Sequence, residues 1–187
     1  MKLITATLFA CAIGAATVLG GTTMAAAHDG SESTIATNSP ETLGQLAQAR
    51  AASAKYHDVN VAIADGYVPS AECAALPGVG GMGYHYINYG RIMDGVFDVT
   101  KPEILLYAPA QDGLRLAGVE FFAVDQDQNL GTDTDRPSLF GVPFDGPMPG
   151  HEPGMPIHYD LHVWVWQHNP AGIFAVWNPA LRCTVQS

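Results

Sequence analysis

Two cysteines far apart in the sequence constrain the fold of this chain more than any other feature. Of the three cysteines in the 187 residues, Cys11 lies in an apolar N-terminal segment, which leaves Cys73 and Cys183. An even number of cysteines in an oxidising compartment usually pairs. A bond between the two would close a loop of about 110 residues and stabilise the fold by up to roughly 4 to 5 kcal/mol in the chain-entropy picture. We therefore predict a Cys73–Cys183 disulfide, with two buried free thiols as the alternative.

The N-terminal segment has the features of a cleavable signal peptide. Lys2 supplies a positive charge, residues 3–18 are almost all apolar, and the alanines from Ala25 to Ala27 offer a small-residue cleavage site. The apolar run is shorter than the ~20 residues that span a bilayer comfortably. We predict a signal peptide over residues 1–27, cleaved after Ala25 or Ala27. The protein is then secreted or periplasmic, with no membrane insertion after cleavage.

The charge balance argues against nucleic acid as a partner. Eighteen acidic and eight basic residues give a formal net charge of -10, which becomes -11 when Lys2 leaves with the signal peptide. Such a balance repels phosphate backbones and anionic lipid, and no cluster of Lys or Arg is present to overcome it. We expect a small molecule or a metal ion as the partner.

The remaining chain is long enough for one domain with its own core. Residues 28–39 are polar and lack a hydrophobic period, which indicates a flexible leader, and Ser39-Pro40 has the features of a helix start. Apolar residues at an approximate 3.6-residue spacing, ended by Gly66, predict one long helix over residues 41–64. We therefore predict a single domain over residues 40–187.

After Cys73, strand-like runs alternate with glycine and proline. Residues 110–113 and 168–172 are predicted to form hairpin turns, whereas residues 125–156 hold too many prolines and glycines for a regular element and are predicted to be a long loop. The fold class is α+β, one long N-terminal helix packed on a mainly antiparallel sheet, with a barrel-like curl left open. The predicted strands cover residues 84–89, 103–108, 114–124, 157–167 and 173–177.

The segment Ile157–Trp166 is the most informative in the chain, because side chains in a strand alternate between two faces. One face holds only Ile, Tyr, Leu and Val, which is an ordinary core. The other face holds His158, Asp160, His162 and two tryptophans, a combination that packing alone would not select. This second face is predicted to line a polar cavity.

Four side chains are the candidate metal ligands: His85, Glu120, His158 and His162. Glu120 lies inside an otherwise apolar strand and needs a partner if it is buried. Imidazole with carboxylate suits Zn, Cu, Mn or Fe, and Asp160 would orient a ligating histidine. His158 and His162 are about 13 Å apart in a regular strand, so they cannot bind one ion together directly. The alternative is a set of hydrogen-bonded core residues without a metal.

Two further metal sites are considered. Asp125, Asp127 and Asn129 place oxygen atoms at alternate positions, as calcium loops do, but Arg136 stands where a closing Glu is needed. We therefore prefer a solvated acidic loop to a calcium site for this segment. Cleavage before His28, or two residues earlier, would place this histidine near a new N-terminus, where its ring and the amine suit Cu(II).

Other catalytic patterns find little support. The glycine-rich run Gly78–Gly83 precedes no helix and lacks a Lys-Ser/Thr pair, so it is not a phosphate loop. The chain contains no Gly-x-Ser-x-Gly elbow, and its two remaining cysteines are predicted to be bonded. A hydrolase that uses a serine or cysteine triad is therefore not expected.

Three segments carry a resemblance to a known family: MGYHY (82–86), HYDLHVWVWQHNPAG (158–172) and FAVWNPALRC (174–183). The chain resembles a group of secreted bacterial proteins with no assigned chemistry. The resemblance covers residues 40–187 and implies an exported domain whose C-terminal cysteine is a family feature. It brings no catalytic residue with it.

The leading functional hypothesis is an exported domain whose His/Glu pocket binds a divalent transition metal, as a metalloenzyme or as a metal-binding protein. Two alternatives stay open. The tryptophans and tyrosines could form a cleft for a small ligand in a non-catalytic module. The protein could also be an envelope or stress protein that forms homo-oligomers.

Overall fold

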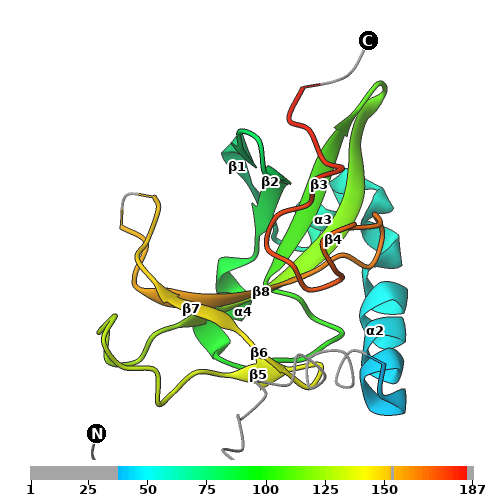
Figure 1. Cartoon of the computed structure of the whole chain (residues 1–187). Helices are drawn as coiled ribbons and strands as arrows, with labels where there is room; N and C mark the ends of the chain where they lie inside the picture. The colour runs from blue at the N-terminus through cyan, green and yellow to red at the C-terminus, as the bar shows by residue number, and fades with distance from the viewer. Residues whose placement is uncertain (1–37, 153, 185–187) are drawn as a thin grey trace, which may run out of the picture.

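A curled antiparallel sheet forms the centre of the computed structural model, which describes residues 38–152 and 154–184 (Figure 1). Within these residues six strands follow the order β1-β2-β3-β4-β8-β7, and each neighbouring pair is antiparallel. The sheet curls into a half-barrel, so the fold is α+β with an antiparallel sheet, as predicted. The predicted signal peptide (1–27) and nearly all of the leader (28–39) lie outside the described residues.

The prediction of one long helix over residues 41–64 is wrong in its length. Helix α2 (Pro40–Ser53) has 14 residues and continues as a 3-10 turn, η1 (Ala54–His57), of 4 residues. Asp58 then adopts an extended conformation (φ -89°, ψ 109°), and its side chain accepts a hydrogen bond at the start of a separate short helix, α3 (Val59–Ala64). The chain therefore turns at Asp58, where a capping residue begins a new helix.

The first four strands are neighbours in both the sequence and the sheet. The predicted turn at residues 110–113 is confirmed, because Ala110 pairs with Gly113. β1 was not predicted; it is an edge strand whose side chains are mostly exposed. The elements are β1 (Val68–Leu76), β2 (Gly80–Ile87), α4 (Tyr89–Asp94), β3 (Ile104–Ala110) and β4 (Gly113–Val124).

The last strand of the sheet is shorter than predicted: β8 covers His158–Val163 rather than residues 157–167. The long loop predicted over residues 125–156 is wrong in part, because it contains β7 (Asp145–Met148), which pairs with β8. It also contains a small separate sheet of β5 (Ser138–Leu139) and β6 (Val142–Pro143). The prolines and glycines limit these strands to a few residues each.

The strand and hairpin predicted at the C-terminal end are wrong. Residues 173–177 are described and none of them is in a strand. One backbone hydrogen bond, from the Trp164 N–H to the Ile173 carbonyl oxygen (2.9 Å), joins this segment to the chain after β8. Beyond it, Asn178 exchanges two backbone hydrogen bonds with Gly81, at 3.0 and 3.1 Å. These bonds hold the C-terminal segment against β2.

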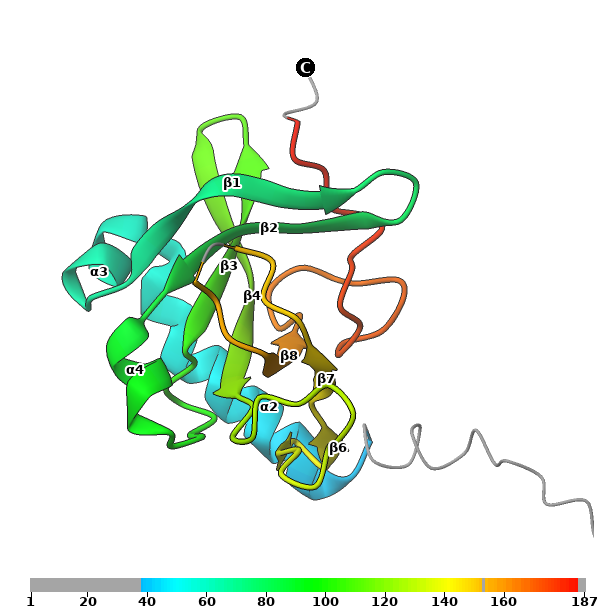
Figure 2. The ribbon, with the colours of Figure 1, turned by 90° about the vertical axis from the view of Figure 1, so that its left-hand side faces the viewer.

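The two faces of the sheet have different coverings. One face packs against α2, η1 and α3 through an apolar core that includes Leu46, Tyr56, Phe121 and Leu161. Figure 2 shows α2 behind β3 and β4, whereas the chain around β7 lies in front of them and the C-terminal segment runs to their right. On this second face a smaller apolar cluster surrounds Leu181, and the polar side chains of β4 and β8 point the same way. The candidate site therefore lies on the face away from α2.

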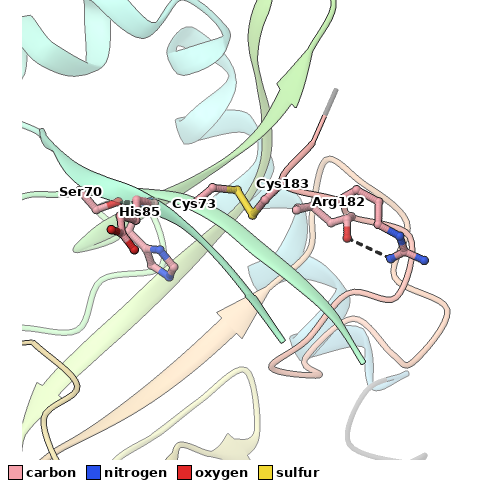
Figure 3. Close-up of a disulfide and its surroundings, with 7 residues drawn as sticks. Ser70, Cys73, His85, Arg182 and Cys183 are labelled. Atoms are coloured by element: carbon pink, nitrogen blue, oxygen red, sulfur yellow. Dashed lines mark hydrogen bonds between the residues drawn. A yellow bond between two sulfur atoms is a disulfide. The ribbon is translucent and has the colours of Figure 1, made fainter. Parts of the chain in front are cut away.

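The predicted disulfide is confirmed. Cys73 and Cys183 are bonded, with Cα atoms 5.6 Å apart and a sequence separation of 110. Cys73 lies on β1 opposite Tyr84 of β2, so the bond joins the edge of the sheet to the C-terminal segment (Figure 3). No helix in the described residues is long and apolar enough to cross a membrane.

Candidate metal centre

Three of the four predicted ligands come together on the second face of the sheet. His85 is on β2, Glu120 on β4 and His162 on β8. Glu120 and His162 are direct cross-strand partners, so their side chains share one face. His85 is two strands from Glu120, with β3 between them, and the curl of the sheet lets the two side chains meet.

The distances within this group suit a metal ion. The His85 Nε2 atom lies 3.3 Å from the Glu120 Oε2 atom, and the His162 Nε2 atom lies 3.7 Å from the same oxygen. One ligand atom from each of the three residues lies within 4.8 Å of the other two. Metal–ligand bonds of about 2 Å allow two ligands of one ion to be about 3 to 4 Å apart. The described residues contain no other such group of three His, Cys, Asp or Glu side chains.

Several polar atoms of this group also lack hydrogen-bond partners. Glu120 Oε2 and both ring nitrogens of His162 are buried and have no hydrogen-bond partner in the described structure. Buried polar atoms are nearly always paired, so each exception needs an explanation such as an ion. Glu120 and His162 are only 4% and 1% exposed, whereas the His85 side chain keeps 16% of its surface open. A cation between these atoms would satisfy them and would have its access at His85.

Asp160 lies where the sequence placed it, behind His162. Its Oδ1 atom is 3.5 Å from His162 Nδ1, the ring nitrogen that does not face Glu120. Histidines that bind metals usually donate their other ring N–H group to a carboxylate or carbonyl, which fixes the tautomer and the orientation of the ring. Asp160 is on the correct side of the His162 ring for this role, but at 3.5 Å the two atoms form no hydrogen bond in the described structure.

The charges within the cluster support one another. Burial alone would raise the pKa of Glu120, but the positive charge of His162 and then that of His85 outweigh burial and lower it. Burial would lower the pKa of His162, but the carboxylates of Glu120 and Asp160 raise it instead. The cluster is thus arranged to hold positive charge next to Glu120. A bound divalent ion would take the place of the His162 proton.

His158, the fourth predicted ligand, is not part of this group. It lies four residues from His162 on β8 and stacks on Phe122, with ring centroids 4.6 Å apart. Its Nδ1 atom lies 3.0 Å from the Pro156 carbonyl oxygen, so this nitrogen carries the proton, and its Nε2 atom is buried without a hydrogen-bond partner. The ring of His151 lies 5.4 Å from that of His158, between centroids. The two rings form a neighbouring pair outside the group of three.

Asp145 is a residue of the site that the sequence did not indicate. It lies on β7 directly opposite Asp160 of β8. Burial and the nearby charge of Asp160 raise the pKa of Asp145. Its position in a segment rich in proline and glycine gave no sign of a strand, so nothing in the sequence connected it with β8.

The acidic loop that was considered for calcium uses several of its oxygen atoms internally. Asp125 accepts hydrogen bonds from the backbone N–H groups of Asp127 and Asn129, both at 3.2 Å. Asp127 accepts one from the Thr132 hydroxyl at 2.7 Å. These are the hydrogen bonds of a tight acidic loop, the interpretation preferred for this segment. His28 lies outside the described residues.

No protein-family model, curated protein or solved structure matches this chain. The class of the site is therefore defined by its geometry alone. Two imidazoles and one carboxylate converge on one point, on the face of a sheet, with one of the three ligands partly open. That is a candidate metal centre of the two-histidine, one-carboxylate kind.

Proposed function

We propose that the protein binds a divalent transition metal ion through His85, Glu120 and His162. The observation that carries this proposal is the convergence of Glu120 Oε2 and His162 Nε2 with His85 Nε2, the first two buried and without hydrogen-bond partners. The ion would satisfy these atoms, and Asp160 would hold the His162 ring in the orientation that binding requires. This donor set is used for zinc, and also for iron(II), manganese and copper(II).

The three protein ligands leave at least one coordination position open. Structural zinc sites are closed by four protein ligands, whereas three ligands and an open position are typical of sites that bind water or a substrate. In this chain the partly exposed edge of His85 is where that position would face. Such an ion would lower the pKa of a bound water molecule or polarise an oxygen atom of a ligand. We therefore propose a centre that can exchange a small ligand, in an exported protein, as the disulfide supports.

The test is a metal analysis of protein purified without an affinity tag. We expect about one equivalent of metal per chain, and the apoprotein should be stabilised thermally by Zn²⁺. Titration with Zn²⁺, Mn²⁺, Fe²⁺ and Cu²⁺ would then rank the ions. A protein without stoichiometric metal, and without a thermal shift in any of the four ions, would overturn the proposal.

Two variants locate the site. Glu120→Gln keeps the size of the side chain and removes its charge, and His85→Asn changes the ligand that is least buried. Each should weaken Zn²⁺ binding by at least about 100-fold, because a three-ligand site loses a third of its donors. His168→Asn changes an exposed histidine elsewhere and should bind as the wild type does. Equal binding by all three variants would place the metal somewhere else.

A further inference from the structure

A second site lies outside the metal centre, between the β3–β4 hairpin and the C-terminal segment. It is a cavity of about 210 Å³. The end of the hairpin supplies Ala110 and Arg115, the chain after β8 supplies Gln167, and the C-terminal segment supplies Arg182 and Thr184. The lining of this cavity contains two arginines and no aspartate or glutamate, although the chain as a whole carries a net charge of -10.

Among the basic residues of the described chain, Arg115 and Arg182 alone have neither an ion-pair partner nor a cation–π contact with an aromatic ring. Lys55, Lys101 and Arg136 each form an ion pair with an aspartate. Arg50 donates to the Val165 carbonyl oxygen and lies over the Trp166 ring. Arg91 donates to the Pro102 carbonyl oxygen and lies over the Tyr67 ring. Neither arginine of the cavity forms an ion pair with any described residue.

Both guanidinium groups are held in place while donors remain free. Arg115 Nη2 donates to the Gln167 side-chain oxygen at 3.2 Å, across the cavity wall. Arg182 Nη1 donates to the backbone carbonyls of Pro179 and Leu181. Figure 3 shows Arg182 next to the disulfide, which fixes its segment through Cys183. The remaining N–H groups of both arginines are available, and guanidinium groups bind phosphate and carboxylate oxygens in this forked way.

We propose that this cavity binds the anionic oxygens of a small ligand, a phosphate or carboxylate group, through Arg115 and Arg182. The hydroxyl of Thr184 and the amide of Gln167 lie in the same lining and offer further donors. The proposal does not depend on the metal centre. It gives this acidic protein one place where an anion is attracted rather than repelled.

What carries the anion is indicated by a neighbouring cavity. This second cavity, of about 320 Å³, shares Leu181 and Arg182 with the first. It is lined by the apolar side chains of Leu76 and Val79, which are 46% and 44% exposed. A free oxyanion would use the first cavity alone. An anionic group with an alkyl chain would also cover the second one.

The experiment compares inorganic phosphate and octyl phosphate as ligands of chelator-treated protein, by calorimetric titration at constant ionic strength in sodium chloride. We expect binding that Arg115→Gln and Arg182→Gln each weaken by at least about tenfold. The matched control Lys101→Gln removes one exposed positive charge elsewhere and should bind as the wild type does. Both arginines are exposed, so both variants should fold.

The outcomes separate cleanly. Equal affinity for the two ligands would identify a free oxyanion as the natural partner. The other result is that octyl phosphate binds more tightly than inorganic phosphate and that this difference is lost in Leu76→Ser. This result would identify an anion with an apolar chain as the natural partner. The proposal is overturned if neither ligand binds beyond the effect of chloride, or if Lys101→Gln weakens binding as much as the arginine variants do.

Discussion

Asp160 would act on the proposed metal centre only through His162. It lies 3.5 Å from His162 Nδ1, on the side of the ring away from Glu120. In Asp160→Asn, the ring would lose the carboxylate that stabilises its N–H group, and zinc affinity should fall about 10- to 100-fold. Competition with a chromophoric chelator measures this change. Asp133→Asn, at an exposed ion pair, is the control and should leave the affinity unchanged.

Glu103 makes a separate prediction about pH. Its carboxyl group is 1% exposed and has no hydrogen-bond partner in the described structure. Burial raises the pKa of Glu103 to about 8, from an ordinary value of 4.5. Between these two values the folded state holds a proton that the unfolded state has released, so stability falls as the pH rises. Below about pH 4.5 the raised pKa of Glu103 does not reduce the stability of the fold, and above about pH 8 the reduction has reached its full size.

The variant Glu103→Gln isolates this effect. It should remove a pH-dependent cost on the order of 4 kcal/mol, so the variant should gain on the wild type as the pH rises. Urea unfolding at several pH values from 4 to 9 would measure the difference between the two proteins. Parallel pH profiles for variant and wild type would show that Glu103 is ionised in the folded protein.

For the individual residues of the site, the sequence was a good guide. Glu120 stood out because a carboxylate in an apolar strand needs a partner, and the alternation of β8 placed His162 on the same face. His158 was the uncertain member, since four residues along a strand are too far apart for one ion. His85 was named as a candidate, but the pairing of β2 with β3 is what brings it near Glu120, and the sequence predicted only the turn between β3 and β4.

Among the elements, the errors have three physical causes. The helix prediction ran past Asp58 because apolar residues continue at helical spacing on both sides of the new cap. β1 was missed because an exposed edge strand lacks a buried face and so has no alternation. Residues 173–177 are apolar enough for a strand, but they form a loop from which Ile173 and Phe174 pack against the core.

A glycine in β2 tests how closely the strands approach. Gly83 has φ +95°, and a Cβ atom there would meet the Tyr107 carbonyl group of β3 at a distance that real side chains do not reach. Gly83→Ala should therefore destabilise the protein by at least about 3 kcal/mol. Gly95→Ala is the matched control: its φ is +65°, but nothing lies within 4 Å, and we expect a loss of only about 1 kcal/mol.

Chemical denaturation of both variants would separate the cost of the steric contact from the cost of the left-handed backbone. A larger loss for Gly83→Ala than for Gly95→Ala reports the steric contact with β3, beyond the cost of the left-handed backbone. Equal losses would mean that β2 and β3 move apart easily.

For the whole molecule, the disulfide is the main covalent constraint. It closes a loop that contains all three residues of the metal centre, and it starts from Cys73, beside His85 on the neighbouring strand. The hydroxyl oxygen of Ser70 on β1 also accepts a hydrogen bond from the backbone N–H group of His85 at 3.1 Å. Loss of the bond should therefore affect the site as well as stability.

The variant with both Cys73→Ser and Cys183→Ser should be less stable by up to about 4 to 5 kcal/mol. Its affinity for zinc should fall several-fold, because β1 holds His85 less firmly. Unfolding in urea and a zinc titration measure the two effects. Dithiothreitol should reproduce both changes in the wild type and do nothing further to the variant. An unchanged unfolding midpoint would contradict the prediction.

The order of the strands has a consequence for how the molecule assembles. β1 to β4 follow one another in both the chain and the sheet, so they can pair while the later chain is still unfolded, with residues 88–103 as their longest connection. β8 pairs with β4 only when the longer segment between Val124 and His158 closes. Pairing between distant segments is slow because loop closure costs entropy before any contact forms. His162 joins the site only when β8 pairs with β4. We therefore expect the metal ion to bind late in folding and to stabilise the pairing of β8 with β4.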